Sequence, residues 1–133
     1  MMPFKDPAVE AVFDAFPQST RKGALALRDL IFETAQTLPD THPMQEALRW
    51  GQPAYLAPKG STLRLGGHKS ANFALFVHCQ TRLIGDYNSV FPGEDRLDGN
   101  RAVLFNHPGQ IDANRHGWLI ARALTYHVTE KTR

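Results

Sequence analysis

The sequence predicts an α+β fold in which helices flank one antiparallel β-sheet. Segments with the apolar spacing of helices lie near both ends of the chain, and segments with strand-like alternation lie between them. Glycine and proline divide the middle of the chain into short pieces, which is typical of hairpins. Because the strands follow one another and do not alternate with helices, an antiparallel sheet of about five strands is expected.

Two helices are predicted at the N-terminal end. Asp6 and Pro7 form a typical helix start, because aspartate can cap the first turn and proline fits its first position. Pro17 ends this short helix. A second helix is predicted from about Ser19 to Leu38, with its apolar residues on one side.

The strands come next, with a closing helix after them. The predicted strands are Gln45–Trp50, Ala54–Ala57, Thr62–Leu65, Phe73–Cys79 and Arg101–Phe105. Gly66 and Gly67 indicate a bulge or a bend. A short helix is predicted in residues 81–90, and Asp112 is expected to cap a final helix that runs to about His127.

The Trp50-Gly51 pair interrupts the strand alternation and marks a sharp change of direction. Trp50 shares a strand side with Leu48, so it is expected to pack against the core. Gly51 is expected to adopt a backbone conformation that other residues avoid. Pro53 favours an extended Gln52 and a second strand after the turn.

Composition predicts one cytoplasmic domain that spans residues 1–133. Its 42% hydrophobic and 21% charged residues are ordinary for a globular protein. A net charge of +2 without a concentrated basic patch argues against nucleic acid, and no apolar run is long enough to span a membrane. Cys79 is the only cysteine and ends an apolar strand, so it is expected to be buried and unreactive.

No common catalytic motif appears in the chain. Phosphate loops, dinucleotide fingerprints, zinc-finger spacings and nucleophile elbows are all missing from the sequence. Among the six histidines no His-x-x-x-His pair occurs, and the nearest helical pairing is that of Asp112 with His116, one turn apart. Capping explains Asp112, so His116 is expected in a solvated first turn.

Residues near irregular strand ends suggest a pocket for a small anion. Aromatic residues there can form a floor, and Arg49, Arg64 and Arg101 can share one sheet face by alternation. The candidate ligand-binding residues are Arg49, Trp50, Tyr55, His68, Lys69 and Arg101. A second interpretation is open, in which the aromatic residues only pack and the arginines are only solvated.

The chain resembles the YdhG-like family, a large bacterial domain family of unknown function. The matching pieces are Phe16-Pro17, Leu27-Arg28-x-Leu30-Ile31, Trp50-Gly51-x-Pro53-Ala54-Tyr55 and His68-Lys69. The resemblance implies an α+β sandwich similar to frataxin, and one bacterial member is described as an iron chaperone. For that role the resemblance points to Glu10 and Asp14, one turn apart on the first helix. A second interpretation is an ordinary solvated helix face.

The expected function is non-catalytic binding of a small anionic ligand or a metal ion, with iron as a possible cofactor. Three alternatives are open: a frataxin-like iron-handling protein, a small enzyme that uses His68 as acid or base, and a protein-interaction module.

Overall fold

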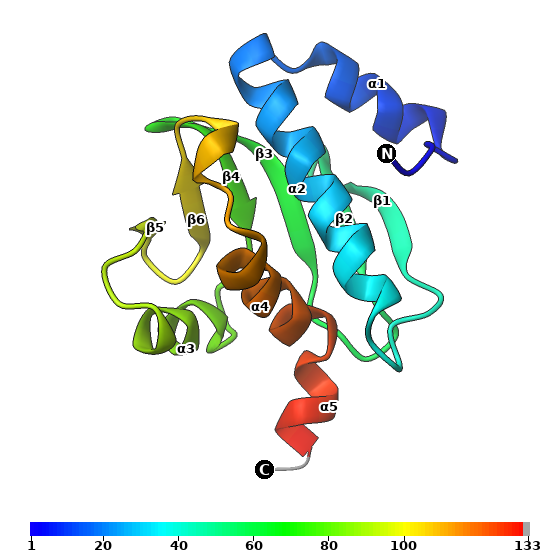
Figure 1. Ribbon diagram of the computed structural model, residues 1–133. Coiled ribbons are helices and arrows are strands. Elements are labelled where there is room, and N and C mark those ends of the chain that lie inside the picture. Colours follow the sequence, from blue (N-terminus) through cyan, green and yellow to red (C-terminus); the bar gives the residue numbers. More distant parts are fainter. Residues whose placement is uncertain (132–133) are drawn as a thin grey trace.

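Six antiparallel strands form one sheet, and the helices pack on one of its faces (Figure 1). The computed structural model describes residues 1–131 of the chain, with side chains through residue 128. The strands are β1 (Gln45–Arg49), β2 (Gln52–Leu56), β3 (Leu63–His68), β4 (Ala71–Phe76), β5 (Arg96–Asp98) and β6 (Ala102–Phe105). The helices are α1 (Pro7–Ala15), α2 (Gln18–Gln36), α3 (Leu83–Val90), α4 (Ala113–Leu124) and α5 (Tyr126–Lys131), with a 3-10 turn, η1 (Pro108–Gln110), before α4.

The strand order across the sheet is β1-β2-β3-β4-β6-β5. The first four strands form a meander, and β6 pairs with both β4 and the edge strand β5. The predicted α+β class, with two N-terminal helices and a closing helix, is confirmed. The sequence predicted about five strands, and β5 is the additional one. It has three residues, which are too few for a visible alternation.

The helix starts follow their capping residues. Asp6 accepts a hydrogen bond from the backbone N–H of Ala8 at 2.8 Å, and Asp112 accepts one from the N–H of Arg115 at 2.8 Å. Both predicted caps are confirmed. The final helix does not run unbroken to His127, because α4 ends at Leu124 and α5 begins after Thr125. No helix among the described residues has the length and apolar character needed to cross a bilayer.

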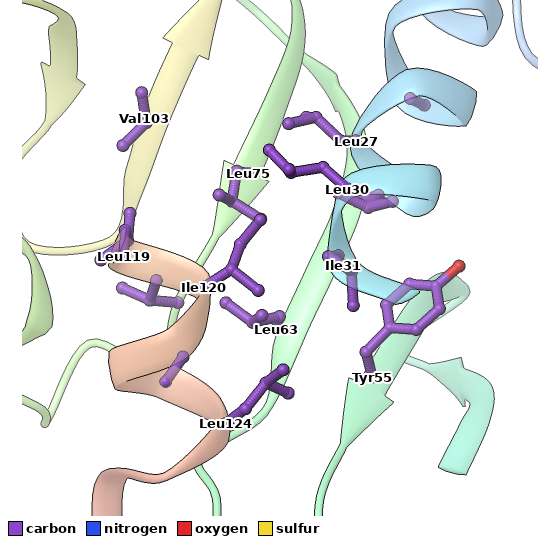
Figure 2. Packing of buried hydrophobic residues seen from close by; sticks show 14 of the residues in the cluster. Leu27, Leu30, Ile31, Tyr55, Leu63, Leu75, Val103, Leu119, Ile120 and Leu124 are labelled. Carbon is purple, nitrogen blue, oxygen red and sulfur yellow. The ribbon is translucent and has the colours of Figure 1, made fainter. Parts of the chain in front are cut away.

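The main core lies between the sheet and the helices α2 and α4 (Figure 2). Leu27, Leu30 and Ile31 point from α2 toward the strands, and Leu119, Ile120 and Leu124 do so from α4. The strands contribute Tyr55, Leu63, Leu75 and Val103. Burial of this apolar surface is the main force that holds the two layers together.

The opposite face of the sheet carries no helix in the described part of the chain (Figure 1). Alternation places every second strand residue on this open face. A small apolar cluster of Ala74, Ala102 and Leu104 lies there, with Phe76 against it. The predicted irregularity at Gly66 and Gly67 is confirmed by a register shift between β3 and β4.

Gly23 allows α2 to pack closely against the sheet. A Cβ atom at this residue would lie 2.1 Å from a ring carbon of Phe73. Phe73 is fully buried and stacks on Phe105 with ring centroids 4.9 Å apart, so it cannot withdraw easily. We expect Gly23→Ala to lower the free energy of unfolding by about 1–3 kcal/mol through overpacking, as measured by urea denaturation.

Gly117 provides the matched control in α4. A Cβ atom there would be 3.8 Å from its nearest neighbour, which is an ordinary contact. Gly117→Ala is expected to stabilise the protein by about 1 kcal/mol, the usual helix preference for alanine. Equal effects of the two substitutions would show that close packing does not explain Gly23.

Candidate functional site

A cavity of about 610 Å³ opens on the helix-free face of the sheet. It lies beside the β1–β2 hairpin, the end of β4 and the turn that joins β5 to β6. Its lining includes Arg49, Trp50, Arg64, Phe76, Asp98 and Arg101. This volume is within the range of small-molecule sites, which span about 300–1,000 Å³. Three of the six predicted ligand-binding residues meet here, namely Arg49, Trp50 and Arg101.

Three of the lining residues, Arg64, Phe76 and Asp98, belong to one row of residues across four strands. Arg64 of β3 lies opposite Phe76 of β4, Phe76 lies opposite Ala102 of β6, and Ala102 lies opposite Asp98 of β5. Directly opposed residues of antiparallel strands project from the same face. Arg64 and Asp98 therefore stand at two ends of a row, with an aromatic ring and a small residue between them.

Trp50 and Gly51 form the turn at the rim of the cavity. Their φ angles are 53° and 75°, so both residues are in the left-handed region that two-residue hairpin turns require. The predicted unusual backbone of Gly51 is confirmed. The same conformation is rare for a bulky residue such as tryptophan and is often found at functional sites.

The predicted core position of Trp50 is wrong, because its side chain is 84% exposed. The strand ends at Arg49, so the alternation that joined Trp50 to Leu48 does not continue through the turn. Trp50 instead lies against the guanidinium of Arg64, whose central carbon is 4.9 Å from the ring centroid. The ring thus forms one wall of the open-face cavity.

Arg64 is held between two aromatic rings. Its central carbon lies 4.9 Å from the Trp50 ring centroid and 5.3 Å from that of Phe76. Its Nη1 donates a hydrogen bond to Oε1 of Gln52 at 2.5 Å. Gly66 leaves room for that Gln52 side chain, because a Cβ atom there would lie 2.6 Å from the Gln52 amide nitrogen. Burial lowers the pKa of the Arg64 guanidinium from its usual value.

Three arginines and one carboxylate, Asp98, line this cavity, and the charge of Arg101 contributes to the lowered pKa of Asp98. Arg49, Arg64 and Arg101 form no ion pair with a described carboxylate, and Arg49 donates only to a backbone carbonyl. Buried or interfacial guanidinium groups are usually paired with acids. A partly desolvated, unpaired Arg64 therefore suits an anion that comes from solution.

His68 does not line the cavity but contacts Asp98, which does. Its Nε2 lies 2.9 Å from Oδ2 of Asp98, and its Nδ1 accepts the backbone N–H of Ser70 at 3.1 Å. An Nδ1 that accepts leaves the proton on Nε2, so His68 donates to Asp98. The hydrogen bond from His68 lowers the pKa of Asp98, which therefore remains ionised. Both ring nitrogens of His68 are therefore engaged by described residues.

Two further candidates lie away from the cavity. Tyr55 is fully buried on the opposite face, where its hydroxyl donates to Oε2 of Glu46 at 2.6 Å. Lys69 is exposed in the turn between β3 and β4 and is not part of the cavity lining. Strand alternation separates Tyr55 from the site, since it faces the helices with Leu63.

Cys79 is exposed, so its predicted burial is wrong. The strand β4 ends at Phe76, and Val77 is the last buried residue of this apolar run. Beyond that point the chain turns toward the surface and Cys79 reaches the cavity lining. The apolar run indicated the strand correctly but did not indicate where it ends.

The acidic face of α1 offers two of the residues that the iron hypothesis requires. Glu10 and Asp14 are exposed, as expected for either interpretation of this face. No group of three or more His, Cys, Asp or Glu side chains suitable for a metal ion occurs among the described residues. Two exposed carboxylates alone do not fit a resident metal ion, which usually has more protein ligands.

The sequence did not reveal a buried polar cluster around Asp95. Asp95 accepts hydrogen bonds from Nε of Arg115 at 3.0 Å, from His116 at 3.1 Å and from the Tyr87 hydroxyl. His116 is fully buried, so its predicted solvated position is wrong. Its Nδ1 accepts the N–H of Asp112, which leaves Nε2 to donate to Asp95. Because these groups are mutually satisfied, we assign the cluster a structural role.

Comparison with known proteins gave no match, whether with models of protein families, with curated proteins or with solved structures. The resemblance to the YdhG-like family therefore depends only on the residues given above.

Proposed function

We propose that this protein binds a small organic anion in the open-face cavity and does not catalyse a reaction on it. The observation that carries the proposal is Arg64, a partly desolvated guanidinium without a carboxylate partner among the described residues. Arg49 and Arg101 add positive charge at the same cavity. Arginine is suited to this role because its planar fork matches carboxylate and phosphate groups.

The aromatic walls favour an anion with an apolar body. Phe76 lies on the floor of the cavity and Trp50 at its rim. An apolar part of the ligand can therefore be buried against these rings while its charged group binds Arg64. The engaged state of His68 supports binding without acid–base chemistry at that residue. Its role in this proposal is to position Asp98.

The test is a thermal-shift screen with small carboxylates and phosphate monoesters, followed by calorimetry. A ligand that binds the folded state raises the melting temperature, with a stabilisation of about 2.7 kcal/mol at 100 times its Kd. We expect Arg64→Met to weaken binding about tenfold or more, since a charge-assisted bidentate contact contributes roughly 1.5–3 kcal/mol. Failure of every anion to shift the parent would contradict the proposal.

Arg96→Met is the matched control. Arg96 lies on the same sheet face, opposite Leu104, but outside the cavity, and it donates to the carbonyl of Ser70 at 2.9 Å. Its loss changes the net charge by the same amount as Arg64→Met. Ligand affinity should stay within about twofold of the parent, because a charge outside the site is largely screened. Equal losses in both variants would indicate a non-specific charge effect.

A further inference from the structure

One carboxylate stands among the arginines of the cavity. The side chain of Asp98 is 37% exposed and lines the cavity together with Arg49, Arg64 and Arg101. Its Oδ2 is engaged by His68, while its Oδ1 accepts no hydrogen bond from any described residue. A site for a simple anion gains nothing from this charge, because it repels the ligand. Asp98 therefore needs a different explanation.

The position of Asp98 is fixed from two sides. The backbone N–H of Arg101 donates to the Asp98 carbonyl at 2.9 Å, which closes the turn between β5 and β6. His68 reaches its carboxylate from β3, and only 9% of that histidine side chain is exposed. A carboxylate held in this way presents its second oxygen to the cavity at a defined place.

The Phe76 ring lies near both Arg64 and the histidine that engages Asp98. The Arg64 guanidinium carbon lies 5.3 Å from the Phe76 ring centroid, and the His68 ring centroid lies 6.3 Å from the same point. A ligand that contacts both Arg64 and Asp98 has to extend over Phe76 and Ala102, because the two charged residues stand at opposite ends of the row.

The free edge of Arg64 sets the orientation of such a ligand. Trp50 and Phe76 lie against the Arg64 guanidinium, and the Gln52 side chain accepts a hydrogen bond from its Nη1. Nε and Nη2 donate to no described residue, so one N–H fork is open. These two N–H groups can donate parallel hydrogen bonds to the two oxygens of one carboxylate that lies in the plane of the guanidinium.

We propose that the ligand carries a carboxylate at one end and an ammonium or other hydrogen-bond donor at the other. The carboxylate binds the open edge of Arg64, the apolar middle lies over Phe76, and the donor binds Oδ1 of Asp98. This inference rests on the proposed anion site and states which class of anion that site prefers. Asp98 selects against ligands that are anionic at both ends, and His68 acts as a positioning residue for it.

Three probes of similar shape test the inference. In 4-(aminomethyl)benzoate both charged ends are present, whereas 4-ethylbenzoate lacks the ammonium and 4-methylbenzylamine lacks the carboxylate. Protein-observed NMR titrations measure each affinity, and the indole N–H of Trp50, assigned with Trp50→Phe, reports on the cavity. The variants are Asp98→Asn, which can still accept from His68, and Arg64→Met. Unchanged amide spectra away from the cavity establish that both variants fold.

The parent is expected to bind 4-(aminomethyl)benzoate about three- to fivefold more tightly than 4-ethylbenzoate, the range for a partly exposed ion pair. Asp98→Asn should abolish this preference and leave 4-ethylbenzoate at least as tightly bound. Equal affinities in the parent, or a preference that survives Asp98→Asn, would overturn the inference while the anion site stands. If neither carboxylate binds, or Arg64→Met weakens neither, the proposed function fails and the inference falls with it.

Discussion

Replacing Glu46 with alanine is expected to lower the free energy of unfolding by about 3–5 kcal/mol, because it leaves a buried guanidinium without its acid. Arg28 of α2 is fully buried, and its Nε and Nη2 donate to the two carboxylate oxygens of Glu46 at 2.6 and 3.1 Å. Burial alone would lower the pKa of Arg28, but the bonds to Glu46 reverse this and raise it. Urea denaturation at neutral pH measures the loss.

The surroundings of Arg28 explain the size of this effect. Its guanidinium carbon lies 3.9 Å from the Phe4 ring centroid and 4.8 Å from that of Phe32. It also donates to the backbone carbonyls of Met2 and Pro3, which attaches the N-terminal segment to α2. Without Glu46 the buried cation keeps only the backbone carbonyls and aromatic rings and loses the negative charge that offsets its desolvation.

A double substitution distinguishes the destabilisation by an unpaired buried charge from the contribution of the Arg28–Glu46 ion pair to stability. Arg28→Met/Glu46→Leu removes both charges and is expected to be more stable than Glu46→Ala alone, because no unpaired charge is left. Arg28 supports the N-terminal segment, so some loss relative to the parent is expected. A double variant less stable than Glu46→Ala would contradict the proposed reason. So would a Glu46→Ala variant that unfolds like the parent.

Asp95→Asn is expected to cost about 2–3 kcal/mol at neutral pH, since Asp95 accepts charge-assisted bonds from Arg115 and His116. Burial raises the pKa of Asp95, but the bonds from His116, Arg115 and Tyr87 outweigh it and hold that pKa well below the usual range. The unfolded carboxyl has a pKa of about 3.9. The stabilisation is therefore full above about pH 5 and is lost as the pH falls below about 4 toward the folded-state pKa.

The measurement compares urea denaturation of the parent and Asp95→Asn at pH 7 and pH 3. The difference between them should shrink at pH 3, because the parent then loses a contribution that the variant lacks. Asp86→Asn is the control, since Asp86 pairs with Arg122 at 2.8 Å near the surface. It should cost no more than about 1 kcal/mol. A pH-independent difference for Asp95→Asn would contradict the argument.

Local features in the sequence predicted the helices and most of the strands. Asp6 and Asp112 mark helix starts because a cap requires only neighbouring residues. The turn at Gly51 was likewise predictable from glycine chemistry alone. The three-residue strand β5 was missed, since its pairing with β6 is decided by the rest of the sheet.

Burial at the ends of strands was less predictable. Trp50 and Cys79 both continue an apolar or alternating pattern, and both lie beyond the last paired residue of a strand. His116 was misjudged in the opposite direction, because its partner Asp95 is 21 residues away and comes from a loop. Sequence patterns show which residues are apolar, whereas a strand ends where the adjacent strands of the sheet no longer pair with it.

The sequence by itself determined the α+β class, the helix caps and the unusual backbone conformation of Gly51. Those features follow from periodicity and from the chemistry of adjacent residues. Only the tertiary structure decided that Arg64 lies between two rings, that His68 holds Asp98 and that Tyr55 faces away. These contacts join different strands, so they depend on strand order and register, which no short stretch of sequence specifies.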